Sequence, residues 1–262
     1  MNCRAPCARA NVLGVGISAI DLPAAVHFVL QALQSKCRGY ICVTGAHGVI
    51  EAQADRALRG ILNRAYLCTP DGMPTVWMSR LMGYRNVRRV YGPDLMLEVC
   101  HTSIAHGFRH FVYGGANGTA ERLRKSLCER FPGLQIVGTF EPPFRALNAA
   151  EEIKLKDEIT AARPDVMWVG LSTPKQEKFM AEYLAKLDVT LMIGVGAAFD
   201  FHTGQVKQAP RWMQRSGLEW MYRVYREPRR LWRRYFKVVP QFIYLAAAQL
   251  LGFRTIALEE PA

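Results

Sequence analysis

The sequence predicts an α/β fold: a Rossmann-like, mostly parallel sheet sandwiched by helices, with a basic helical appendage at the C-terminus. Short, continuously apolar runs alternate with longer segments of helical periodicity, which is typical of parallel sheets covered on both faces. Polar and glycine-rich clusters follow the apolar runs, and the alternation stops after Ala209. We therefore expect an α/β domain over residues 1–208 and the appendage over residues 209–262.

The apolar runs predict the strands. They are continuous rather than alternating, as expected of strands that are buried on both faces. Their ranges are 11–17, 40–44, 65–69, 110–113, 134–138, 166–171 and 190–195.

Helical periodicity fills the intervals between these runs. Pro74, Pro93 and Pro174 stand where a first helical turn begins, a position that tolerates proline because no backbone N–H is needed there. Residues 173–176 match a capping box, which would explain Thr173 and Gln176 without any ligand. The predicted helices are 23–34, 49–63, 74–82, 93–106, 119–131, 149–162 and 174–186.

The C-terminal segment predicts a basic amphipathic appendage over residues 211–253, packed against the sandwich or a bilayer. Residues 211–237 carry nine Arg and Lys side chains but only two acids, Glu219 and Glu227. The uncharged run 238–253 is short for a membrane span and contains Pro240 and Gln249, so an interfacial or buried helix is expected. Apolar residues stand at 218, 221, 225, 232, 235, 239 and 242, in helical steps broken only across residue 228.

The net charge of +12 indicates an anionic partner: nucleic acid, acidic lipid or a phosphorylated ligand. Aromatic residues interleave with the arginines as base stacking would require, but the chain holds far more core than a nucleic-acid-binding module needs. A nucleotide-dependent oxidoreductase is a second alternative, although no G-x-G-x-x-G follows the first apolar run. A membrane-peripheral scaffold without a catalytic site is the third. Residues 1–10 lack the apolar stretch of a signal peptide.

Ligands of doubly wound sheets bind beyond the carboxyl ends of the strands, which directs attention to the polar clusters there. Asp71 is either a general base at the rim of the sheet or the acid of an Asp-Gly turn. Gly114 and Gly115 either admit a phosphate or form a plain tight turn. Lys175 at a helix start opposes the helix dipole, a conflict that a phosphate would relieve. His47 either contacts substrate or is structural.

No metal site is predicted. His101, His106 and His110 are not spaced as zinc ligands are, and no Asp-x-Asp is present. If a diphosphate binds, arginines must neutralise it.

Taken together, these clusters resemble the WecG/TagA/CpsF family of bacterial glycosyltransferases, glycosyltransferase family 26. The resemblance spans residues 11 to 235, and several blocks in the same order are more specific than any single block. They are 43–44, 69–74, 90–95, 113–115, 169–177, 193–200, 209–212, 217–220 and 227–230.

The resemblance implies an inverting, metal-independent transfer from a UDP-sugar to a polyprenyl-diphosphate-linked sugar, without a cofactor. It further implies a peripheral enzyme on the cytoplasmic face of the plasma membrane that binds the anionic membrane surface and builds cell-surface or exopolysaccharide material. Nucleic acid is not an expected partner, and a homo-oligomer is left open.

The resemblance also assigns roles to residues. It places the catalytic aspartate on Asp71, with Thr44 and Gln176 beside it, and Asp200 near the nucleotide. The arginines that close over the diphosphate fall on Arg223, Arg230 and Arg233.

One position departs from the family pattern. Members that transfer N-acetylmannosamine commonly have an asparagine where this chain has Ala46, and His47 follows. The donor sugar is therefore left open among N-acetylmannosamine, its uronate and glucose.

Overall fold

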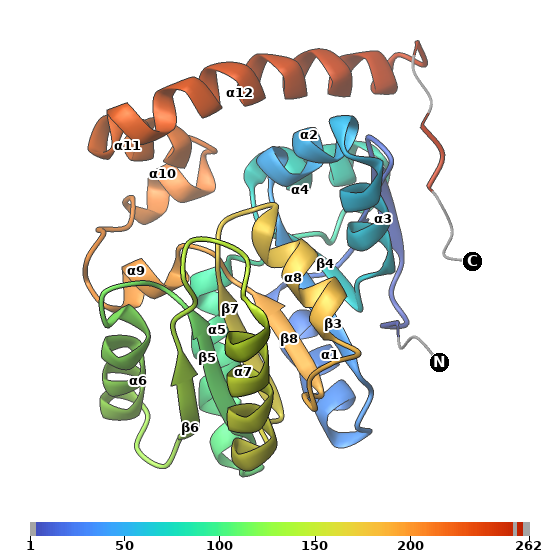
Figure 1. The fold of residues 1–262 in the computed structure, drawn as a ribbon. Helices are drawn as coiled ribbons and strands as arrows, with labels where there is room; N and C mark the ends of the chain where they lie inside the picture. The colour runs from blue at the N-terminus through green and yellow to red at the C-terminus, as the bar shows by residue number, and fades with distance from the viewer. Residues whose placement is uncertain (1–3, 254–255, 259–262) are drawn as a thin grey trace.

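The predicted α/β sandwich is confirmed. The structure, a computed structural model, describes residues 4–253 and 256–258, except the side chain of residue 230. A six-stranded parallel sheet has the order β4-β3-β8-β7-β5-β6 (Figure 1). The strands are β3 (Gly39–Thr44), β4 (Leu67–Pro70), β5 (Arg109–Gly114), β6 (Gln135–Phe140), β7 (Val166–Gly170) and β8 (Leu191–Gly194).

Helices cover both faces of this sheet. One face packs against α1 (Leu22–Gln34), α5 (Gly92–Ile104), α6 (Thr119–Arg130) and α9 (Ala198–His202). The other face packs against α3 (Arg56–Arg64), α7 (Ala149–Ala162) and α8 (Lys175–Tyr183). Helices α2 (Ala46–Ala54) and α4 (Met73–Leu81) begin beyond the carboxyl ends of β3 and β4.

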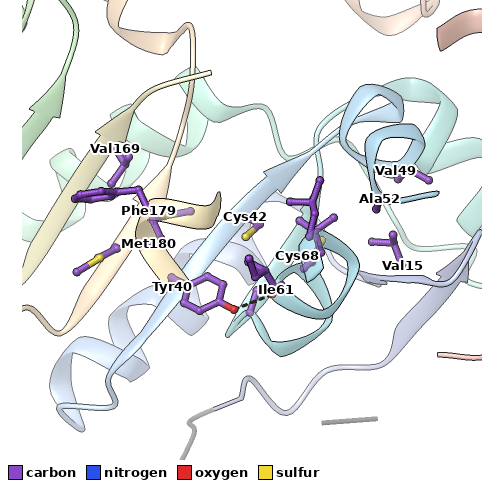
Figure 2. Packing of buried hydrophobic residues seen from close by; sticks show 14 of the residues in the cluster. Val15, Tyr40, Cys42, Val49, Ala52, Ile61, Cys68, Val169, Phe179 and Met180 are labelled. Carbon is purple, nitrogen blue, oxygen red and sulfur yellow. Dashed lines mark hydrogen bonds between the residues drawn. The ribbon is translucent and has the colours of Figure 1, made fainter. Parts of the chain in front are cut away.

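The two faces explain why the strand sequences are continuously apolar. Along β3, Tyr40 and Cys42 belong to the core on one side, whereas Ile41 and Val43 belong to the core on the other. Figure 2 shows the first of these cores, where the buried Tyr40 hydroxyl donates to the Ile61 carbonyl at 2.8 Å. A buried polar group is thus satisfied within an otherwise apolar layer.

The single strand predicted over residues 11–17 is wrong. The segment forms an antiparallel hairpin of β1 (Arg9–Val12) and β2 (Val15–Ser18), outside the parallel sheet. Leu13 and Gly14 both have positive φ, 54° and 82°, which closes a two-residue turn. The Asn11 side chain fixes this turn by accepting the Gly14 N–H at 2.9 Å.

The single helix predicted over residues 49–63 is also wrong, because α2 and α3 are separate helices. Asp55 interrupts them in an extended conformation and caps α3, where its carboxylate accepts the Leu58 N–H at 2.9 Å. An aspartate in this position competes with the helical backbone and favours a new helix start.

The appendage consists of α10 (Arg211–Arg215), α11 (Glu219–Arg226) and α12 (Pro228–Leu250), so the predicted interruption at Pro228 is confirmed. The predicted apolar stripe faces the sandwich only in part: Phe242 is buried, whereas Met221, Tyr225 and Trp232 are exposed. Leu231, Val238, Phe242 and Leu245 are buried, and the last three belong to the same core cluster as Val49 of α2. None of the described helices is long and apolar enough to cross a membrane.

Helix α12 packs on α2 beyond the carboxyl ends of the strands (Figure 1). Its last turn is attached to the hairpin by Gln249, whose amide accepts the Leu13 N–H at 2.8 Å and donates to the Asn11 carbonyl at 2.7 Å. The appendage therefore forms a roof over the end of the sheet at which ligands of this architecture bind.

Candidate functional site

A cavity of about 1020 Å³ lies between the carboxyl ends of the strands and the appendage. The segments that follow all six parallel strands contribute to its wall, and α11 and α12 contribute its roof. Among the lining residues are Thr44, Asp71, Gly115, Pro142, Gln176, Gly196, Arg223, Arg234 and Tyr235.

The ends of β3 and β4 bring Thr44 and Asp71 together. The Asp71 N–H donates to the Thr44 carbonyl at 3.1 Å, which extends the parallel ladder by one step. The following turns also approach closely, since a Cβ at Gly45 would lie 3.8 Å from the Gly72 nitrogen. Both predicted residues therefore lie at one point of the cavity wall.

The Asp71 carboxyl faces the cavity with 31% of its side chain exposed. Its Oδ1 is buried and, among the described residues, has no hydrogen-bond partner. Burial raises the pKa of Asp71 to about 6, while Arg89 acts to lower it and Glu219 acts to raise it. At pH 7 the carboxyl is therefore mostly ionised, and its raised pKa makes it a stronger proton acceptor than an ordinary aspartate.

Arg89, which sequence reasoning missed, supports this end of the cavity. Its Nε donates to the Asp71 carbonyl, and its Nη2 lies 3.6 Å from Asp71 Oδ1 and 2.6 Å from Glu219 Oε2. The guanidinium also lies over the Tyr91 ring, 4.0 Å from its centroid. Glu219 offered a signal for this site, being one of only two acids in a strongly basic segment.

The predicted capping box at the start of α8 is wrong. Pro174 is the N-cap and provides no side-chain cap. The Thr173 hydroxyl instead donates to Glu177 Oε1 at 2.9 Å, and Gln176 Nε2 donates to the same oxygen at 3.0 Å. Gln176 Oε1 accepts the Gly196 N–H at 3.1 Å. Gln176 thus links the loops that follow β7 and β8.

Glu177 is a second residue that sequence reasoning missed. It lines the cavity although only 1% of it is exposed, and its Oε2 has no hydrogen-bond partner in the part of the chain described. Burial raises the pKa of this carboxyl. The signal was its place directly after Gln176 in a polar cluster at a strand end.

The glycine-rich segment after β5 does not offer a free helix N-terminus. The N–H groups of Gly118 and Ala120 donate to the Glu141 carboxylate at 2.9 and 2.7 Å, so a protein anion already occupies the start of α6. Gly115 lines the cavity, but Gly114 is absent from the lining and packs against Gly170. A Cβ at Gly114, where φ is 127°, would lie 2.5 Å from the Gly170 carbonyl oxygen.

The appendage brings cations to the cavity. Arg223 lines it, and its Nε is buried without a hydrogen-bond partner among the described residues. Arg234 also lines the cavity, whereas the exposed Arg233 lies 5.5 Å from the Trp232 ring centroid and is not part of the lining. Arg230 belongs to α12, but its side chain lies outside the described residues.

The remaining predicted residues, His47, Lys175 and Asp200, also line the cavity. Burial lowers the pKa of His47 to about 4, and the Arg234 charge acts in the same direction, so the imidazole is neutral at physiological pH. Lys175 is exposed at the start of α8. No group of three His, Cys, Asp or Glu residues placed to hold a metal ion occurs within the described residues.

Comparison with known proteins identifies relatives of the chain. The sequence profile of the glycosyl transferase WecG/TagA/CpsF family matches residues 10–255. An N-acetylglucosaminyldiphosphoundecaprenol N-acetyl-beta-D-mannosaminyltransferase from Bacillus subtilis is 31% identical over 70% of this chain and 70% of its own length. The enzyme of the same name from Bacillus spizizenii is 31% identical over 74% of this chain and 72% of its own. The one from Staphylococcus aureus is 26% identical over 93% of this chain and 94% of its own.

Proposed function

Because this chain belongs to the WecG/TagA/CpsF family of glycosyl transferases and is a hexosyltransferase that acts on a lipid-linked sugar, we propose that it uses Asp71 as general base for an inverting transfer from a UDP-sugar. The acceptor is a polyprenyl-diphosphate-linked sugar, and the product feeds cell-surface or exopolysaccharide synthesis. The observation that carries the assignment is the Asp71 carboxylate in the cavity, with an unbonded Oδ1 and a pKa raised to about 6.

In the proposed reaction the Asp71 carboxylate accepts the proton of the attacking acceptor hydroxyl. The hydroxyl oxygen forms a bond to the anomeric carbon as the bond from that carbon to the diphosphate oxygen breaks. The electron pair of the broken bond leaves with UDP. Attack from the face opposite the leaving group inverts the anomeric configuration.

Cationic side chains of the appendage are suited to stabilise the leaving diphosphate without a metal ion. Arg223 presents a buried Nε–H that lacks a partner among the described groups, and a phosphate oxygen would satisfy it. Arg234 adds a second cation from α12. Charge stabilisation of this kind, by groups that are already in place before the reaction, is commonly a large part of catalysis.

The donor remains a choice among N-acetylmannosamine, its uronate and glucose. Relatives with a mannosaminyltransferase name favour the first. Ala46, which stands where members that transfer N-acetylmannosamine commonly have an asparagine, and the neutral imidazole of His47 line the cavity next to Thr44. All three donor sugars should therefore be tested. Peripheral membrane association on the cytoplasmic side is part of the proposal, because the acceptor is anchored in lipid.

The direct test is transfer of label from a panel of radioactive UDP-sugars into polyprenyl-diphosphate-linked N-acetylglucosamine in detergent or membranes. One donor is expected to give labelled lipid. Asp71→Asn is expected to lower kcat by about 10²- to 10⁴-fold, the usual contribution of a general base, and to retain UDP binding. Near-normal turnover by this variant would remove Asp71 from the role. Absence of lipid labelling with every donor would overturn the reaction itself.

A further inference from the structure

A single guanidinium, that of Arg89, lies between two carboxylates that are far apart in the sequence. Asp71 follows β4, whereas Glu219 begins α11 in the appendage. The ion pair to Glu219 is short, with Nη2 2.6 Å from Oε2, and the approach to Asp71 Oδ1 is 3.6 Å. The second oxygen of the Glu219 carboxylate, Oε1, accepts a hydrogen bond from the Tyr91 hydroxyl at 3.3 Å.

These contacts are largely removed from solvent. The Arg89 and Glu219 side chains are each 15% exposed, so their attraction is screened less than that of a surface pair. Arg89 is further fixed by stacking on Tyr91 and by its bond to the Asp71 carbonyl. The guanidinium therefore forms its short ion pair with Glu219, and it does not hydrogen-bond to Asp71 Oδ1.

We propose that Glu219 is a positioning residue for the reaction proposed above: it retains the Arg89 guanidinium on the appendage side and so keeps the Asp71 carboxylate available to accept a proton. A closer, hydrogen-bonded contact between Arg89 and Asp71 Oδ1 would make the carboxylate a weaker base. Because Glu219 belongs to α11, an available base also requires the appendage to be in place over the cavity.

The other charged and titratable groups around Asp71 do not replace Glu219 in this role. Asp94 of α5 is a further carboxyl whose pKa the Arg89 and Glu219 charges affect, but among the described residues Arg89 forms its ion pairs with Asp71 and Glu219. Arg223 approaches from α11 and favours the ionised carboxylate, as Arg89 does. Tyr91 and Tyr235 face the same region with their own pKa values raised by burial, so both are neutral. Burial is the largest cause of the raised pKa of Asp71, and the Glu219 charge acts in the same direction, which supports the geometric argument.

The test is the pH profile of transfer by Glu219→Gln, which keeps the size of the side chain but removes its charge. Arg89 is then expected to turn to Asp71, and the acidic limb of kcat/KM should move down by about one pH unit, the scale of a new neighbouring cation. Turnover above pH 7 should fall several-fold because the base is weaker. Glu129→Gln, which removes an equal charge from the exposed surface of α6, should leave the profile unchanged.

A second measurement follows the carboxyl itself without any turnover. In protein labelled with ¹³C at the aspartate carboxyl carbons, the Asp71 resonance is assigned by its loss in Asp71→Asn, and its titration is compared between the wild type and Glu219→Gln. A lower Asp71 pKa in the variant supports the proposal, and an equal or higher one overturns it. Inactivity of the wild type with every donor would refute the proposed reaction but leave this titration interpretable.

Discussion

At the scale of single residues, the cavity holds ionisable groups in environments that oppose their usual charge. Asp71 and Glu177 are carboxyls whose pKa values burial raises, and His47 is an imidazole whose pKa burial lowers. Such environments cost stability, because the charged form of a group is better solvated in the unfolded chain. Groups shifted in this way cluster at functional sites, so their convergence on one cavity supports its assignment.

This cost predicts that Asp71→Asn stabilises the protein at alkaline pH. The folded pKa, about 6, exceeds the unfolded value, so the contribution of Asp71 to stability is greatest below pH 4 and is lost as pH rises through 6. The asparagine variant lacks this loss. We expect its free energy of unfolding to exceed that of the wild type by about 1–2 kcal/mol at pH 8, allowing for partial solvent contact, and to converge with it near pH 4.

Urea denaturation at pH 4, 6 and 8 measures this difference. Asp157→Asn, at an exposed position of α7, is the matched control and should show no pH-dependent gain. An Asp71→Asn protein that is less stable than the wild type at pH 8 would show that the ionised carboxylate stabilises the fold, which would contradict the cost of burial argued above.

The sequence indicated which polar residues reach the cavity, but not how they are paired. Asp71 could be selected because it follows an apolar run, whereas Thr44, Gln176 and Arg223 were selected from the family resemblance. Their partners could not be selected, since Arg89 and Glu219 are separated by more than a hundred residues and no periodicity relates them. The capping-box pattern at Thr173 was misleading because Glu177 competes for the same hydroxyl.

At the scale of elements, the attachment of α12 to the hairpin determines where the roof lies. Gln249 closes a pair of hydrogen bonds with the backbone of Leu13 and Asn11, and Asn11 in turn donates to the carbonyl of Ile256. Residues near both ends of the described chain are thereby held together, on the side away from Glu219. The appendage is fixed at its far end by neutral hydrogen bonds and at its cavity end by an ion pair.

Replacing Gln249 by Ala should loosen the last turns of α12. Two partly buried hydrogen bonds are lost, so we expect a destabilisation of about 1–3 kcal/mol. Amide hydrogen exchange should accelerate most at residues 241–250 and in the hairpin, and remain unchanged in the sheet. Gln241→Ala, on the same helix, is the control because no hydrogen bond of its side chain occurs in the described structure. Equal exchange in the two variants would contradict the attachment.

Elements were predicted well where one physical signal dominates. The parallel strands follow from runs that are apolar on both faces, and the break at Pro228 follows from proline chemistry. The hairpin was missed because Leu13 at positive φ is an unusual residue for its turn. The predicted apolar stripe of the appendage is buried at Phe242 but exposed at Met221, Tyr225 and Trp232, because helical spacing alone does not tell which apolar side chains contact the sandwich.

At the scale of the whole molecule, α12 has apolar side chains on an exposed side as well as on its buried side. Val238 and Phe242 pack in the core with α2, while Trp232, Phe236 and Ile243 repeat at helical spacing on an exposed side. The same helix also carries exposed cationic side chains, Arg229, Arg233 and Lys237. A helix with exposed aromatic residues beside a row of cations is typical of binding to an anionic lipid surface.

We therefore predict that the protein binds vesicles containing anionic lipid and that both kinds of side chain contribute. The double substitution Trp232→Ser and Phe236→Ser should weaken binding at least tenfold, because about 1.4 kcal/mol of lost apolar burial suffices for that factor. Arg233→Ala should weaken it about fivefold, from about 1 kcal/mol of electrostatic attraction, and this contribution should fade at high salt.

Co-sedimentation with anionic and with neutral vesicles measures both effects. Phe144→Ser is the control, since Phe144 is 88% exposed but lies in the loop between β6 and α7. If that variant lost affinity as the double variant does, or if the wild type bound neutral vesicles equally well, the appendage would not be the membrane-binding surface.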